Sequence, residues 1–173
     1  MDIRTEVAPP SPQPIGRPEP HGLWGWLILP LIGLCLTPFL LAFSIYQLVL
    51  ILEPSTWNVL TTPGTPAYHP IYKVLIPAEM VVNFAMLGFT LLLVVLFFRK
   101  DPRLPKLMVA FYLINLVIIV GDTFAASFIP SFSFDRDVIR DVVRTVIAAV
   151  IWVPYFLVSQ RVKNTFRRDA PGA

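Results

Sequence analysis

The sequence predicts an all-α integral membrane protein, built as a bundle of four transmembrane helices. Of its 173 residues, 55% are hydrophobic and only 14% are charged, whereas about a quarter of the residues in soluble domains are charged. A soluble domain of this length could not bury so much apolar surface in one core. The apolar residues also stand in long uninterrupted blocks, a pattern for which lipid is the natural solvent.

Four apolar blocks are long enough to cross the hydrocarbon core as helices. These blocks are residues 23–52, 74–98, 107–129 and 138–159, within a transmembrane domain at 22–160. Pro30 and Pro38 in the first block each remove a backbone hydrogen bond, so a bend is expected near both. The segment 53–73 is expected to be a polar connection, and Ser133 or Asp135 is expected to cap the last helix.

Polar tails flank the transmembrane domain. Residues 1–21 contain six prolines, which cannot support a helix, so a disordered tail is expected there. Residues 161–173 are expected to form a basic tail. The single cysteine, Cys35, excludes an intramolecular disulfide and is interpreted as a small hydrophobic residue within a helix.

The lysines and arginines outside the apolar blocks predict which way the protein faces. The amino-terminal tail holds two of them, the connection at 99–106 four, and the carboxy-terminal tail four, so ten of the fourteen share one side. The other four are Lys73, Arg136, Arg140 and Arg144. Because the side richer in lysine and arginine stays in the cytoplasm, both termini are expected to be cytoplasmic.

The strongest local motif lies where the fourth block ends. Its members are Pro154, Tyr155, Phe156, Ser159, Arg161, Val162, Lys163, Thr165 and Phe166. Pro154 interrupts the helical hydrogen bonds there, and aromatic and basic residues are typical of a membrane boundary. Two interpretations stay open: a membrane exit with an anchor, and a docking peptide for a cytoplasmic partner.

This motif resembles the end of a bacterial family catalogued as domain of unknown function 2569. The opening of the first block, with Gly22, Gly25, Trp26 and Leu27, and Arg144 in the last block are similar to that family too. The resemblance covers residues 22–166. It implies a small multi-pass protein of the bacterial inner membrane with four spans, and it implies no activity.

Ionisable side chains inside a span are costly and normally face the bundle interior, which makes them the default candidates for a site. The candidates are Glu79, Asp122, Arg140 and Arg144, with Asn83, Asn115 and Gln47 as polar neighbours. Counted from the outer ends of their spans, Glu79, Asp122 and Arg144 lie roughly 9 to 12 Å deep. All four spans are therefore expected to contribute to one polar layer in the outer half of the membrane.

Two functions follow from such a layer. In the first, acids and arginines form an ion-paired clasp that sets the helix register of an interaction or accessory protein, which associates with another membrane protein or a second copy. The alternative is a small transporter or proton-coupled channel using Glu79 and Asp122. Nearer the surface, Arg136, Asp137, Arg140 and Asp141 are also spaced to pair along their own helix.

Other function classes lack their motifs. The two histidines, His21 and His69, do not stand at metal-ligand spacing, and no nucleophile elbow, phosphate loop or zinc-protease motif is present. We therefore predict no enzymatic activity, catalytic residue, metal or cofactor. No nucleic-acid-binding motif is present either. The lipid bilayer is the one partner that the composition requires.

Overall fold

The computed structural model describes residues 26–129 and 132–166. The predicted proline-rich tail at 1–21 and the end of the basic tail, from Arg167 onward, lie outside these residues, as do Gly22 and Gly25.

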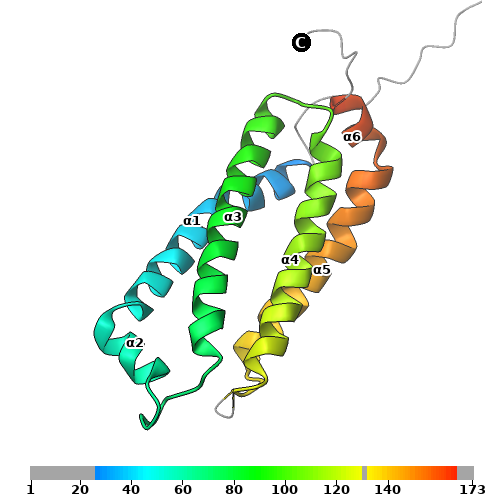
Figure 1. Cartoon of the computed structure of the whole chain (residues 1–173). Coiled ribbons are helices and arrows are strands. Elements are labelled where there is room, and N and C mark those ends of the chain that lie inside the picture. The colour runs from blue at the N-terminus through cyan, green and yellow to red at the C-terminus, as the bar shows by residue number, and fades with distance from the viewer. Residues whose placement is uncertain (1–25, 130–131, 167–173) are drawn as a thin grey trace, which may run out of the picture.

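Four long apolar helices dominate the described part of the chain (Figure 1). They are α1 (Ile28–Ile51), α3 (Tyr72–Phe98), α4 (Leu104–Ala126) and α5 (Arg136–Val158). At 1.5 Å per residue these helices are roughly 35 to 40 Å long, enough to cross a hydrocarbon core of about 30 Å. The predicted all-α fold is therefore confirmed, and its four long apolar helices are candidate membrane spans.

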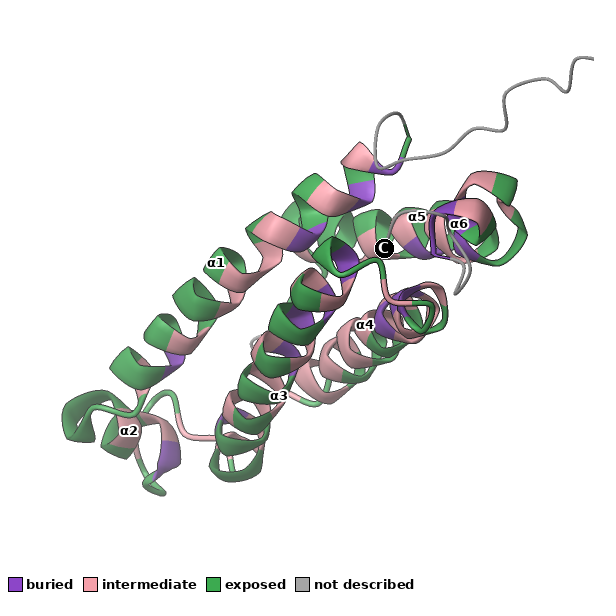
Figure 2. Cartoon of the chain, turned by 90° about the horizontal axis from the view of Figure 1, so that it is seen from above, coloured by how far each residue is buried: buried purple, intermediate pink, exposed green. Residues whose placement is uncertain are grey.

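The four helices are arranged as two antiparallel pairs. α1 packs along α3, α4 packs along α5, and a smaller contact between α3 and α4 joins the two pairs. In Figure 2, which views the molecule from above, α3 lies next to α4, and the start of α1 comes toward α5. Prolines lie inside α1, α3 and α5, namely Pro38, Pro77 and Pro154, and the helices continue through all three.

The buried core is concentrated at the end of the molecule where α3 turns into α4. It includes Leu27, Leu34, Met86, Leu93, Phe97, Leu104, Met108, Phe111, Phe156, Val162 and Phe166. The outer faces of the spans carry large exposed apolar side chains, such as Phe39 at 74% and Val150 at 67%. Such faces suit contact with lipid, because a water-exposed protein rarely leaves so much apolar surface uncovered.

A short helix, α6 (Gln160–Thr165), follows α5 and closes this end of the bundle. Ser159 separates the two helices, and its hydroxyl accepts a hydrogen bond from the Val162 amide at 3.5 Å. Val162 is fully buried, and the Phe166 ring packs edge-on against Phe97, with 5.7 Å between the ring centroids. The first part of the expected basic tail is thus a helix that contributes to the core.

The connection between α1 and α3 contains a second short helix, α2 (Pro54–Thr61). Proline is favoured in the first turn of a helix because its missing N–H would have no partner there. Thr61 is buried, and its hydroxyl donates to the Trp57 carbonyl at 2.7 Å. The connection that the sequence predicts as simply polar is therefore partly helical.

Candidate functional site

A cavity of about 690 Å³ lies between α1, α3 and α4. Most of its wall is apolar, with side chains such as Leu48, Val82 and Ile118. Its polar lining residues are Ser44, Gln47, Glu79, Asn83, Asn115 and Asp122. An apolar cavity of this size with a few convergent polar groups is the usual form of a small-molecule site.

Helix geometry places these polar side chains at one end of the molecule. Gln47 lies one turn before the end of α1, and Asp122 one turn before the end of α4. Glu79 lies two turns after the start of α3, at the same end of the bundle. Asn83 stands four residues after Glu79, and Asn115 stands seven before Asp122, so each amide shares a helix face with its acid.

The carboxyl groups of Glu79 and Asp122 face each other across the contact between α3 and α4. Both side chains are half-buried, and each acts electrostatically on the other. No lysine or arginine in the described ranges lines this cavity. The two acids are therefore held close together without a cation to balance them.

The two asparagines add acceptors to the cavity. The Asn83 side-chain amide donates to the Glu79 backbone carbonyl at 2.9 Å, and the Asn115 amide donates to the Phe111 carbonyl at 3.0 Å. Each side-chain nitrogen thereby donates to the backbone of its own helix. The side-chain oxygens remain available as hydrogen-bond acceptors. Together with the two carboxyl groups, these oxygens make a lining that suits a proton donor or a cation.

Small residues beside the acids leave room for the cavity. Ala78 precedes Glu79, Gly121 precedes Asp122, and Ala125 lies one turn later, and all three line the cavity. A Cβ atom built at Gly121 would meet no other heavy atom within 4 Å. Small residues next to intramembrane acids are the sequence signal from which this cavity could have been predicted.

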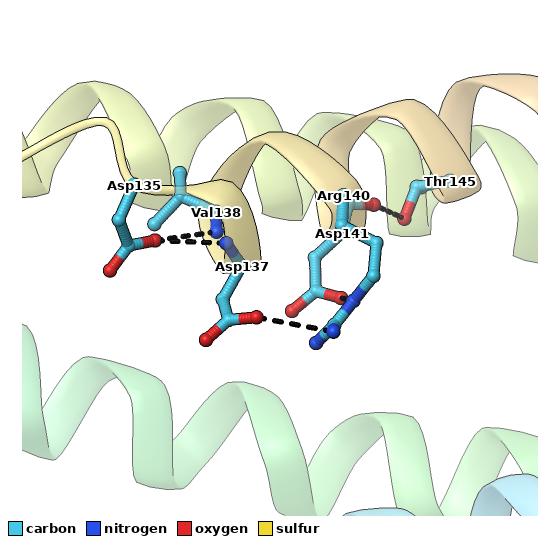
Figure 3. Close-up of polar contacts among 6 residues, drawn as sticks. All are labelled: Asp135, Asp137, Val138, Arg140, Asp141 and Thr145. Carbon is cyan, nitrogen blue, oxygen red and sulfur yellow. Dashed lines mark hydrogen bonds and ion pairs between the residues drawn. The ribbon is translucent and has the colours of Figure 1, made fainter.

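The structure does not bring Arg140 together with the other residues of the predicted polar layer. Arg140 forms ion pairs within its own helix, to Asp137 at 3.1 Å and to Asp141 at 3.7 Å (Figure 3). Its side chain is 68% exposed. Asp135 caps the start of the same helix by accepting from the Asp137 and Val138 amides, as the sequence predicts. The alternative interpretation, pairing along the helix, is the one that the structure supports.

Arg144 lines a different cavity, of about 290 Å³, between α1, α4 and α5. Its neighbours there include Pro30, Thr37, Tyr112 and Trp152. Neither Arg140 nor Arg144 lines the acidic cavity, and neither forms an ion pair with Glu79 or Asp122 within the described ranges. Among the described residues there is consequently no ion-paired layer joining the four helices.

The motif at the end of α5 lies mostly inside the molecule. Trp152 packs edge-on against Tyr155, and Phe156 is buried against Tyr112. Thr165 is buried with Phe166, whereas Pro154 and Lys163 are exposed and Arg161 is half-buried. The apolar members thus hold α6 against the ends of α3 and α4, and the exposed members face outward.

The fold and the cavity together define a class: a multi-pass membrane protein with an acidic cavity between three of its spans. Within that class, the chain belongs to the family of proteins of unknown function DUF2569, which matches residues 20–167. The resemblance that the carboxy-terminal motif indicates is therefore confirmed. No curated protein and no solved structure matches the chain.

Proposed function

We propose that this protein is a small proton-coupled transporter of the bacterial inner membrane, in which Glu79 and Asp122 form the working carboxyl pair. The observation that supports this function is the cavity between α1, α3 and α4, where the two acids face each other without a basic partner. A permanently paired clasp would need a cation at that place. Of the three arginines of α5, Arg140 pairs within its own helix and Arg144 lines another cavity.

The chemistry of the cavity suits an exchange of protons for a positively charged solute. Two carboxylates in poorly solvated surroundings repel each other, and either a proton or a bound cation relieves that repulsion. A proton and a cation therefore compete for the same pair, which is the coupling that such a transporter needs. The oxygens of Asn83 and Asn115 would accept hydrogen bonds from an ammonium group.

The orientation in this proposal follows from the lysine and arginine distribution. With both termini in the cytoplasm, the acidic cavity would lie in the outer half of the membrane and would receive its solute from outside. The proposal involves no bond-making chemistry and no cofactor.

Proton transfer by the full-length protein can be measured in reconstituted vesicles. In vesicles loaded with guanidinium chloride and diluted into buffer without it, the outward movement of this cation through the wild-type protein is expected to drive protons inward and acidify the interior, as reported by an enclosed pH-sensitive dye. Glu79→Gln and Asp122→Asn should reduce this acidification to the rate of protein-free vesicles. Asp141→Asn, which removes an exposed acid of α5, is the matched control and should transport like the wild type.

A second measurement covers the case in which proton movement requires the unidentified solute. Infrared difference spectra between acidic and alkaline buffer should contain a carboxylic-acid carbonyl band that Glu79→Gln or Asp122→Asn removes. If the wild-type vesicles show no acidification and neither substitution changes the carbonyl bands, the carboxyl pair does not exchange protons and the proposed function is wrong.

The alternative function is that of an accessory subunit, and one feature favours it. The strongest contacts lie within the two helix pairs, so each pair leaves long apolar faces, including that of Phe39, for other membrane proteins or a second copy. Purification from the native membrane in mild detergent would then recover a companion in fixed ratio. Recovery of the chain alone would count against this alternative.

A further inference from the structure

A second cavity, of about 400 Å³, lies at the opposite end of the molecule from the acidic one. Three elements form it: the connection before α4 and its first turn, the end of α5, and α6. Its lining residues are Pro102, Pro105, Lys106, Phe156, Leu157, Val162, Lys163 and Phe166. The cavity therefore lies at the boundary between the apolar spans and the polar end of the bundle.

The floor of this cavity is apolar and rigidly held. Phe156, Val162 and Phe166 are at most 3% exposed, because they belong to the main core. Phe166 packs against Phe97, and Phe156 packs against Tyr112. Since these side chains are fixed by packing on their far sides, the cavity is formed before any ligand arrives.

The rim of the cavity is positively charged. Lys106 and Lys163 are both exposed, and neither forms an ion pair with an acid in the described part of the chain. Arg103 adds a third positive charge, because it shares a neighbouring hollow of about 550 Å³ with Lys106. This boundary has three basic side chains directly beside an apolar floor.

The start of α4 adds to the positive potential. Its first turn carries no acidic residue, and no side chain caps its amide groups. The amino-terminal end of a helix dipole is positive and favours an anion. Lys106 stands in this first turn, a position where an acidic residue would be favoured. The Asp101 carboxylate accepts a hydrogen bond from the Arg103 amide just before the helix, at 2.8 Å, so the basic side chains Arg103, Lys106 and Lys163 outnumber this one acid.

We propose that this cavity binds an anionic phospholipid, with the phosphate between Lys106 and Lys163 and an acyl chain against Phe156, Leu157 and Phe166. Basic pockets between membrane helices at this depth suit anionic headgroups. A soluble anion would leave the apolar floor uncovered, and an uncharged lipid would leave the lysines unpaired. An amphiphile with an anionic head satisfies both parts, and this proposal does not depend on the transport proposal.

The test measures lipid binding to the full-length protein after delipidation in detergent. Phosphatidylglycerol and phosphatidylcholine with identical acyl chains are titrated separately, and bound lipid is counted by native mass spectrometry. The wild-type protein should retain phosphatidylglycerol in preference to phosphatidylcholine. Each of Lys106→Gln and Lys163→Gln should weaken phosphatidylglycerol binding roughly fivefold, and the double variant roughly 30-fold, as expected from the contribution of one basic residue to anionic lipid binding.

Two control variants separate this site from general charge effects. Lys73→Gln removes an exposed lysine at the other end of the molecule and should leave phosphatidylglycerol binding unchanged. The double variant Lys106→Arg and Lys163→Arg keeps both charges and should retain most of the binding. Since both lysines are exposed, neither change should prevent folding, and thermal unfolding of each variant checks this.

Three results would overturn the proposal. Equal binding of the two lipids would show that the headgroup charge is not recognised. Unchanged phosphatidylglycerol binding in the double glutamine variant would place the lipid elsewhere. Displacement of phosphatidylglycerol by excess inorganic phosphate would show that the lysines bind a free anion and that the apolar floor contributes nothing.

Discussion

At the scale of single residues, the chemistry of the acidic cavity depends on which helix face each charged side chain occupies. Glu79 and Asp122 face each other, whereas Arg140 turns toward Asp137 and Asp141 on the exposed face of α5. Exposed ion pairs contribute about 0 to 1 kcal/mol, because water already solvates both charges. An arginine that neutralised a buried acid would contribute several times more, since its loss would strand a charge.

This difference gives a test of the Arg140 contacts. Arg140→Ala is expected to lower the free energy of unfolding by less than about 1 kcal/mol. Arg136→Ala, which removes an exposed arginine from the same helix, is the matched control and should behave similarly. Thermal unfolding in detergent provides the measurement. A loss of about 3 to 5 kcal/mol for Arg140→Ala alone would indicate a buried partner and contradict the surface pairing.

A sequence predicts the height of a side chain along its span better than it predicts the neighbouring helix that the side chain faces. The arginines of α5 illustrate this difference. Counting residues from the end of a span gives the height of a side chain, because the rise per residue is constant. The count puts Glu79, Asp122 and Arg144 at similar heights. It does not show which helices are neighbours, and α5 has its main contact with α4 rather than with α3. The two acids meet across α3 and α4, and the arginines lie beyond reach.

At the scale of elements, the long spans could be predicted because each is a long, predominantly apolar run bounded by charges or prolines. The observed bounds of α3, Tyr72–Phe98, differ little from the predicted 74–98. The short helices α2 and α6 could not be predicted in this way. Eight and six residues carry too little periodicity, and isolated helices of that length are marginal without tertiary packing.

Packing of α6 explains why a segment with several polar residues is ordered. Phe166 is 3% exposed and closes the core against Phe97, so it holds the short helix in place. Phe166→Ala should lower the free energy of unfolding by about 3 kcal/mol, since it removes a buried aromatic ring and leaves a cavity. Calorimetry or thermal unfolding of the full chain in detergent measures this.

A matched control for Phe166→Ala lies in the same short helix. Gln160 is exposed, and Gln160→Ala should leave the free energy of unfolding nearly unchanged. If both substitutions have the same small effect, α6 does not contribute to the core. The interpretation of the carboxy-terminal motif as an interior clamp would then be wrong.

At the scale of the whole molecule, the two ends of the bundle differ in charge. The end with α2 carries the acidic cavity between α1, α3 and α4, and the end with α6 carries the cavity rimmed by Lys106 and Lys163. The basic connection between α3 and α4 and the basic residues after α5 gather at this second end (Figure 1). This asymmetry is the feature from which the orientation in the membrane is expected.

The orientation can be tested with single cysteines in a background in which Cys35 is replaced by alanine. Thr62 lies after α2 and Arg99 lies at the end of α3, and both are exposed. Because the end richer in lysine and arginine should stay in the cytoplasm, Thr62→Cys should react with a membrane-impermeant thiol reagent in intact spheroplasts. Arg99→Cys should react only after lysis. As a control for accessibility, both cysteines should react in lysed membranes. If Arg99→Cys rather than Thr62→Cys reacts in intact spheroplasts, the orientation is the reverse, and the acidic cavity lies in the inner half of the membrane.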